Sequence, residues 1–423
     1  MIFRSSILLA FLSGISVLLG IIRDRLLSEY VGVGPVLDVY NASFRIPDLA
    51  LGFMLSFATA STVVPFLTQS KNDGSLEKRF STLFYFFSWA MILVSVFVVI
   101  TVPLYAQSIA PGFNAEQMTM FIMTTRILML QPILIGVSSL ISTLAQMRHE
   151  FVIYGVAPLL YTLGIIFGTI FLFPQFGITG LVFGVVIGAG FHLGFQSYTL
   201  FKAKINPFKY AFSLEYLKDH MKVSIPRSGT YIVSQLRIIF YTAFATTLGV
   251  GVLSSFLFAQ KITDAISQML AQSVSSASLP TLSQHFEEGN HSHHKRIIFK
   301  YSVGLFISGL FIALIIFGLQ DFLVSLLYGK TQAHETIKFF LLAFTIVLPL
   351  QVVTWYLATG FNSMKKTNIV MWSNTIATAV SVVVCIYMKE IGIAALAYGI
   401  IAMNVTYFLI IFSLYLRKSK LYI

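Results

Sequence analysis

Charge and cysteine are scarce in this chain of 423 residues. Charged residues make up 10% of it and hydrophobic residues 57%, and the mean hydropathy is +0.84. No soluble domain of this length needs so much apolar surface, so lipid must surround most of the chain. The single cysteine, Cys385, excludes disulfides and iron–sulfur clusters and is most simply a small packing residue.

Enzyme motifs are missing as well. Gly329-Lys330-Thr331 is similar to the end of a phosphate-binding loop, but Val324 stands where its first glycine belongs. Four histidines have metal-like spacing without a nearby cysteine, and we interpret them as part of a solvated loop: His285, His291, His293 and His294. We therefore expect no catalytic residues, no metal and no cofactor. The driving force would be an ion gradient, the membrane potential or the substrate's own gradient.

Apolar segments predict about twelve transmembrane helices. They cover residues 4–24, 38–68, 81–105, 119–145, 152–173, 178–201, 223–247, 252–282, 298–319, 336–361, 369–388 and 392–415. The predicted fold class is an all-α polytopic membrane protein with two six-helix lobes around a central cavity. The lobes would be residues 1–201 and 223–423. The basic linker 202–222 is either an interfacial helix or a solvated loop.

Basic residues gather in alternate loops. One set of loops, together with the two termini, holds 19 of the 28 lysines and arginines. The positive-inside rule places this set, and therefore both termini, in the cytoplasm. Topology accounts for the net charge of +12 without a nucleic-acid partner. We expect membrane lipids as neighbours and favour a monomer.

Two distant stretches are similar to each other. Phe44-Arg45-Ile46-Pro47-Asp48 precedes Pro65, and Gln260-Lys261-Ile262-Thr263-Asp264 precedes Pro280, with nearly equal spacing from cation to proline. Each cation lies in a long apolar segment. A duplicated membrane protein with matched intramembrane charges is typical of a transporter whose site lies between two halves. The prolines predict helix bending.

Cations outnumber carboxylates in the predicted helices. The cations are Arg23, Arg25, Arg45, Arg126, Arg237 and Lys261, and the nearby carboxylates are Asp24, Asp38, Asp48 and Asp264. A surplus of positive charge suits an anionic substrate, above all a diphosphate, because arginine offers forked donors. The alternative is local pairing, since Asp48 and Asp264 each follow a cation by three residues. For Arg126, near a helix end, snorkelling to the interface is the simpler interpretation.

Glycines recur at four-residue spacing in the sixth predicted span, at Gly180, Gly184 and Gly188. A stripe of small residues lets two helix backbones approach closely. We therefore predict tight helix packing at this stripe.

An ordered set of motifs resembles the MurJ/MviN family, the lipid II flippases of the multidrug/oligosaccharidyl-lipid/polysaccharide exporter superfamily. The motifs are Gly20-Ile21-Ile22-Arg23-Asp24, Asp38-Val39-Tyr40-Asn41-Ala42-Ser43-Phe44-Arg45-Ile46-Pro47-Asp48, Ala110-Pro111-Gly112-Phe113, Ala157-Pro158 and Leu279-Pro280-Thr281-Leu282-Ser283. The resemblance implies a multi-pass protein of the bacterial cytoplasmic membrane. It also implies a substrate site that includes Arg23, Asp24, Asp38 and Lys261.

Three departures from the family pattern concern charge and length. Val17, Leu51 and Gly52 stand where the family has arginines, and Arg45 or Arg237 would offset the missing cations. Many family members have fourteen helices, two more than are predicted here. The resemblance thus leaves the exact lipid-linked substrate open.

Three functions remain as hypotheses. The leading one is a flippase for a polyprenyl-diphosphate-linked saccharide, with lipid II the first candidate and another lipid-linked polysaccharide unit the alternative. A small-molecule exporter of the same superfamily would instead need carboxylates in excess. A membrane scaffold would work through its basic loops and has no need for intramembrane cations.

Overall fold

The computed structural model describes residues 2–57, 63, 67, 75–329 and 331–420. Side chains are described over the same residues except 2–7, 10, 56–57, 222–232 and 418–420. All regular elements within these ranges are helices, and none is a strand. Pro65, which the sequence argument uses, lies outside the described residues.

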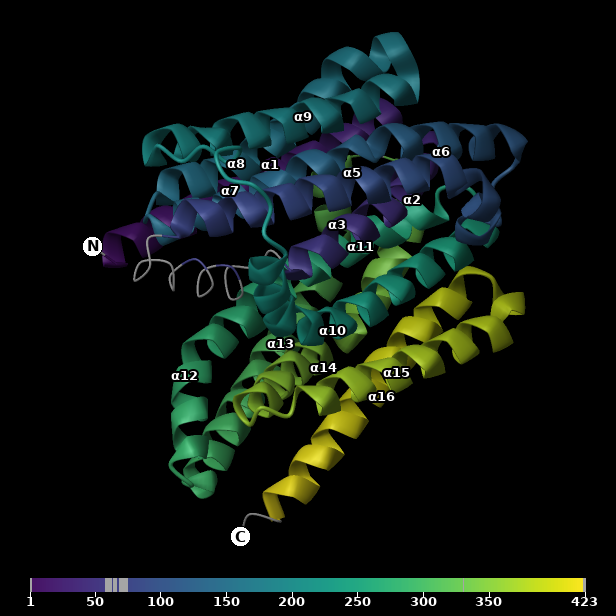
Figure 1. The fold of residues 1–423 in the computed structure, drawn as a ribbon. Coiled ribbons are helices and arrows are strands. Elements are labelled where there is room, and N and C mark those ends of the chain that lie inside the picture. Colours follow the sequence, from purple (N-terminus) through teal and green to yellow (C-terminus); the bar gives the residue numbers. More distant parts are fainter. Residues whose placement is uncertain (1, 58–62, 64–66, 68–74, 330, 421–423) are drawn as a thin grey trace. The chain divides into compact units, whose positions relative to one another are not determined.

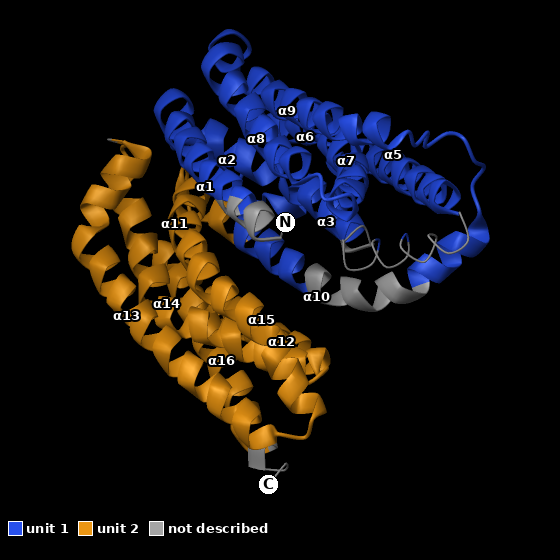
Figure 2. Cartoon of the chain, turned by 90° about the vertical axis from the view of Figure 1, so that its left-hand side faces the viewer, with its two compact units in different colours: residues 1–243 blue, residues 244–423 orange. Residues whose placement is uncertain are grey.

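Two compact units divide the chain, residues 1–243 and residues 244–423 (Figure 2). The first unit contains α1 (Ile2–Leu26), η1 (Leu27–Val31), α2 (Pro35–Ser43), α3 (Arg45–Phe57), α5 (Leu76–Ile109), α6 (Ala115–Leu128), α7 (Leu130–Met147), α8 (Phe151–Phe167), η3 (Gly168–Leu172), α9 (Phe173–Ala203) and most of α10 (Leu214–Thr247). The division falls inside α10. The predicted lobes and the predicted linker 202–222 stay predictions.

The second unit begins with the last residues of α10. It contains α11 (Val252–Ser267), η4 (Gln268–Gln272), α12 (Ser273–Glu287), α13 (His291–Tyr328), α14 (His334–Ser363), α15 (Thr367–Tyr387), η5 (Lys389–Ile391) and α16 (Ile393–Lys420) (Figure 1). The elements η1, η3 and η4 are single π-helical turns and η5 is a 3₁₀ turn.

Each of the twelve predicted spans coincides with a helix or with consecutive helices, as far as the described residues reach. Seven helical stretches in this part of the chain are long and apolar enough to cross a membrane. They contain eight of the predicted spans, because α8 and α9 form one stretch. The other four spans are α1, α2–α3, α10 and α11–α12, and these helices carry all the charged candidate residues except Arg126, which lies in α6. The prediction of an all-helical, multi-pass membrane protein is confirmed.

Pro47 explains why the second span is broken. The chain leaves α2 at Ser43, passes Phe44 and enters α3 at Arg45, so Pro47 lies in the first turn of α3. Proline has no amide hydrogen for the carbonyl four residues earlier, which is that of Ser43, and its ring would clash with that carbonyl. The α-helix is therefore interrupted next to Pro47, where a bend was predicted. In the eighth span the irregular turn is η4, whereas α12 runs through Pro280.

Glycines join α8 and α9 at van der Waals distance. A Cβ added to Gly184 would meet the backbone of Gly168, and one added to Gly188 would meet the backbone of Tyr161 and Gly164. Gly180 likewise faces the backbone of Leu172. Figure 1 shows the two helices side by side. The predicted tight packing at this stripe is confirmed.

α14 lies at the centre of the second unit and packs against α11, α12, α13, α15 and α16. The helices α15 and α16 also pack closely, because Gly399 has no side chain and leaves room for the sulfur of Cys385. Ser381 Oγ donates to the Gly399 carbonyl at 2.7 Å in the same contact. Cys385 is buried, as expected for a small packing residue.

Candidate functional site

Arg23 and Asp24 form an ion pair in the last turn of α1. Arg23 Nη2 lies 2.8 Å and Arg23 Nε 2.9 Å from the same oxygen, Asp24 Oδ1. The arginine side chain is 23% exposed and the aspartate side chain 10%. Both donors therefore converge on a carboxylate held away from solvent, where such a contact is stronger than at an open surface.

Three further polar groups lie within electrostatic range of this pair. Arg23 interacts electrostatically with Tyr40 of α2 and Tyr161 of α8, and both tyrosines interact with Asp48 of α3. Four helices of the first unit thus bring their polar side chains to one place. We call these five residues, Arg23, Asp24, Tyr40, Asp48 and Tyr161, the polar cluster. It combines one cation, two carboxylates and two phenols, which supplies hydrogen-bond donors for an anionic group, and the neighbouring Arg45 balances the charge of the second carboxylate, Asp48.

Asp38 is placed by the start of α2. It is 2% exposed and lies in the first helical turn, and its amide donates to the Gly34 carbonyl at 3.0 Å. Pro35 begins the helix, where a proline needs no amide partner. A carboxylate in the first turn is stabilised by the positive end of the helix dipole.

Arg45 opens α3 directly after the break that Pro47 imposes. Its charge interacts with that of Asp48, one turn further on. Its Nε atom is buried and has no hydrogen-bond partner among the described residues. A buried N–H without an acceptor is costly, so this donor is poised for an oxygen that a ligand or water would bring.

Arg237 lies in α10 before the unit division, and Lys261 lies in α11 after it. Arg237 is half-buried in α10. Lys261 of α11 is exposed, and its ammonium lies 5.4 Å from the centre of the Phe258 ring. That ring stacks on Tyr328 at 4.2 Å, and Tyr328 Oη donates to the Phe258 carbonyl at 2.8 Å. Lys261 thus rests on an aromatic platform that α13 holds in place.

The structure brings some candidates together within the first unit. Arg23 and Asp24 are in direct contact, and Arg45 joins the polar cluster through Asp48. Lys261 belongs to the second unit, where its near neighbour in sequence, Asp264, accepts a hydrogen bond from Gln351 at 3.3 Å. A joint site for all six candidates stays a prediction.

Two tyrosines of the polar cluster were missed in the sequence. Tyr40 lies within the motif around Asp38, so its place in a polar group could have been suspected. Tyr161 gives no such signal, because it is one aromatic residue in an apolar span. Only the packing of α1 on α8 brings it to Arg23.

Arg126 has a structural role. Its Nε donates to the carbonyl of Val99 at 3.0 Å, between α6 and α5. That carbonyl lacks its helical partner because Pro103, four residues later, has no amide hydrogen. Arg126 therefore supplies the hydrogen bond that Pro103 cannot donate in the neighbouring helix. This contact, rather than the expected snorkelling, explains why an arginine lies here.

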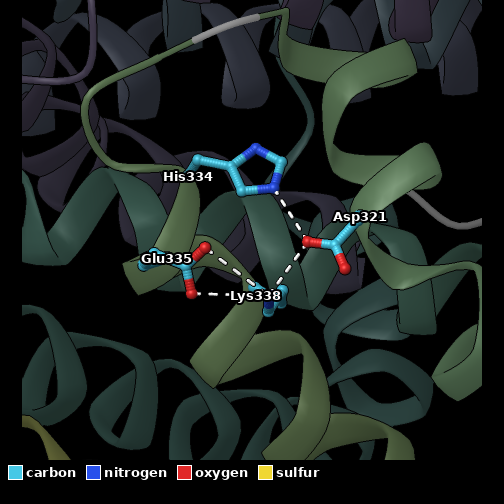
Figure 3. A network of polar contacts seen from close by, with 4 residues as sticks. All are labelled: Asp321, His334, Glu335 and Lys338. Atoms are coloured by element: carbon cyan, nitrogen blue, oxygen red, sulfur yellow. Dashed lines mark hydrogen bonds and ion pairs between the residues drawn. The ribbon is translucent and has the colours of Figure 1, made fainter.

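A second group of titratable residues lies where α13 ends and α14 begins (Figure 3). The carboxylates of Asp321 and Glu335 and the imidazole of His334 are close enough to share a metal ion. However, Lys338 Nζ lies 2.9 Å from Asp321 and 3.4 Å from Glu335. Since the ammonium of Lys338 already pairs with both carboxylates, this group is an ion-pair network that links two helices.

One of the four histidines with metal-like spacing is a packing residue. His294 is buried, and its Nε2 lies 2.9 Å from Ser363 Oγ, which joins α13 to the end of α14. The rings of His285 and His293 are in edge contact, with centroids 4.6 Å apart. These contacts involve three of the four histidines. All four lie in α12 or α13, so the interpretation as a solvated loop was wrong.

The polar cluster and the fold together define a multi-pass helical membrane protein with charged side chains within its membrane-spanning helices. The chain belongs to the family of the lipid II flippase MurJ, whose model matches residues 27–423. A probable lipid II flippase MurJ from Buchnera aphidicola subsp. Acyrthosiphon pisum is 25% identical over 297 residues. This match covers 67% of the chain and 57% of that relative.

Two solved structures share the fold. The lipid II flippase MurJ in an inward closed conformation superimposes with a TM-score of 0.82 at 19% identity, covering 96% of this chain and 87% of that one. A multidrug resistance MATE family transporter of the MOP superfamily, in an inward-facing conformation, gives 0.80 at 16% identity, covering 96% and 95%. The resemblance drawn from the motifs is confirmed.

Proposed function

We propose that this protein is a flippase that moves lipid II, a polyprenyl-diphosphate-linked saccharide, from the inner to the outer leaflet of the bacterial cytoplasmic membrane. The observation that carries the proposal is the polar cluster of the first unit, in a chain that belongs to the MurJ family. Relatives named as lipid II flippases support the substrate. Such a headgroup cannot cross unaided, because each unsatisfied polar group costs several kcal/mol in hydrocarbon.

Each candidate residue has a role in this proposal. Arg23, Arg45, Arg237 and Lys261 attract the diphosphate, and Asp24 and Asp38 balance these charges while no substrate is bound. The unpartnered Nε of Arg45 supports this role, because a phosphate oxygen is the acceptor that it lacks. Lys261 would provide a point charge without the fork of an arginine.

Transport would follow an alternating-access cycle. The lobes 1–201 and 223–423, joined by the linker 202–222, would rock about the substrate, and the polyprenyl tail would stay in lipid. Both termini and the basic loops would face the cytoplasm, as the distribution of lysine and arginine supports. The headgroup would therefore enter from the cytoplasmic side and leave on the other.

Depletion of the protein in its bacterium tests the proposal. Lipid II should accumulate on the inner leaflet and disappear from the outer one, while its synthesis continues. Restoring the chain from a plasmid should reverse this distribution. If another lipid-linked glycan accumulates instead, the substrate assignment is wrong, and if none does, the protein is not this kind of flippase.

A further inference from the structure

We propose that the first unit binds one anionic phospholipid in an apolar groove beside the end of α9. This groove is formed by α5, α7, α9 and residues 204–208, and it encloses about 550 Å³. The volume lies in the range of small-molecule sites. The inference concerns a lipid that stays bound, so it does not depend on the proposed flipping.

The lining of the groove suits a hydrocarbon chain. Side chains from three helices and the following loop form its walls: Phe84, Val137, Ile141, Leu193, Leu200 and Phe208. Such a surface contacts an acyl chain by van der Waals packing and exposes few polar groups to it. The headgroup of a lipid in this position would lie at the end of α9.

The loop that closes the groove is held in place. Ile205 and Pro207 are buried, and the ring of Phe208 packs edge-to-face on Phe84 with centroids 5.3 Å apart. Asn206 Oδ1 accepts from the Phe208 amide at 2.9 Å, which fixes the turn. Lys209 Nζ then contacts Glu77 Oε2 at 2.6 Å, at the start of α5. The wall is therefore preformed, which lowers the entropy cost of binding.

A single available cation marks the rim. Lys204 follows the last residue of α9, is exposed, and its ammonium has no hydrogen bond or ion pair with the described residues. Its neighbours are engaged: Lys202 lies 3.4 Å from Glu150, and the hydrogen bond to Glu77 raises the pKa of Lys209 above its ordinary value. An apolar groove with one unpaired ammonium at its mouth matches an anionic amphiphile.

The groove is separate from the polar cluster. Glu150, which contacts Lys202, precedes α8, whereas Tyr161, which interacts with Arg23, lies well inside that helix. The rise between Glu150 and Tyr161 is about 16 Å at 1.5 Å per residue. A phosphate beside Lys204 is therefore not the diphosphate of a substrate held by Arg23, and a resident phospholipid is the occupant to which we commit.

Native mass spectrometry of the purified full chain tests this site. The chain is titrated with phosphatidylglycerol and, separately, with phosphatidylcholine. We expect one tight site with about five-fold preference for phosphatidylglycerol, the value of one lysine near a membrane surface. Lys204→Gln should abolish the preference, whereas the matched control Lys202→Gln, two residues away and paired in the wild type, should keep it.

A photoreactive phosphatidylglycerol, with the crosslinking group on its acyl chain, tests where the lipid binds on the unaltered protein. Crosslinks should map to residues 193–208, and filling the groove with Ile141→Trp should remove them. Equal binding of both lipids by the wild type, or a preference that survives Lys204→Gln, would overturn the proposal and leave Lys204 as a residue that only caps a helix. Displacement of phosphatidylglycerol by undecaprenyl phosphate at lower concentration would overturn the choice of occupant.

Discussion

Nε and Nη2 of Arg23 meet a single oxygen of Asp24, at 2.9 and 2.8 Å. Nη1 takes no part in this pair, so the guanidinium keeps one face for another oxygen. A phosphate could therefore approach Arg23 while Asp24 continues to hold it. This arrangement explains how one arginine is both fixed in place and able to bind an anion.

Replacing Asp24 by asparagine should destabilise the first unit. The change leaves the Arg23 guanidinium without its counter-charge, and charged hydrogen bonds of this kind contribute about 1.5–3 kcal/mol. Denaturant unfolding in detergent micelles measures the effect. The control is Glu29→Gln, since the exposed pair of Glu29 and Arg25 at 3.9 Å should change stability by less than about 0.5 kcal/mol. Equal effects of the two changes would contradict the account.

Arg45→Lys should separate binding from folding. The lysine keeps the charge beside Asp48 but removes the Nε donor, which has no partner to lose among the described residues. We expect unchanged thermal stability and about ten-fold weaker binding of lipid II, equivalent to about 1.4 kcal/mol. Arg126→Lys is the control, because Arg126 Nε only donates to a backbone carbonyl, and its binding affinity should match the wild type. A loss of stability without a loss of affinity would make Arg45 structural.

Gly184→Ala should loosen the contact of α8 and α9. The added methyl group would meet the backbone of Gly168, which cannot move aside without shifting the helix. Overpacking of this kind costs about 1–3 kcal/mol. Gly190→Ala, in the same helix but with open space around the new methyl group, should be neutral in the same thermal unfolding assay. If Gly190→Ala were as harmful, helix packing would not explain the glycine stripe.

Lys261→Arg should be tolerated, and Lys261→Gln should reduce flipping about ten-fold. Arginine keeps a cation above the Phe258 ring, whereas glutamine removes the charge. The rate of lipid II flipping in proteoliposomes measures both. Lys365→Gln, at an exposed pair with Glu287, should keep the wild-type rate. A membrane scaffold would behave in the opposite way: changes in the basic loops would impair its function, and Lys261→Gln would have no effect.

Helix positions could be predicted because lipid imposes a simple rule on composition. Twenty apolar residues in a row leave few alternatives to a spanning helix, and the twelve predicted segments follow. The break beside Pro47 was also foreseeable, since proline lacks an amide hydrogen. The π-turn at 268–272 was not, because no residue type specifies one.

The candidate site was predictable only where charge interrupts apolar sequence. Arg23, Asp24 and Arg45 gave that signal, and the structure places them in or beside the polar cluster. Tyr161 gave none, because its role comes from the packing of α8 on α1. Arg126 is likewise a charge in an apolar segment, but its role differs from that of Arg45. The sequence does not reveal that the Val99 carbonyl, which Pro103 leaves without a helical donor, lies beside Arg126.

The most direct measurement of the central claim is lipid II flipping by the purified chain in proteoliposomes, compared with Arg23→Ala at matched protein content and fold. The wild-type chain should move lipid II to the opposite leaflet, and Arg23→Ala should lose at least ten-fold in rate while it keeps its helical circular dichroism. Flipping at the wild-type rate by a folded Arg23→Ala protein would contradict the claim that this cation holds the diphosphate.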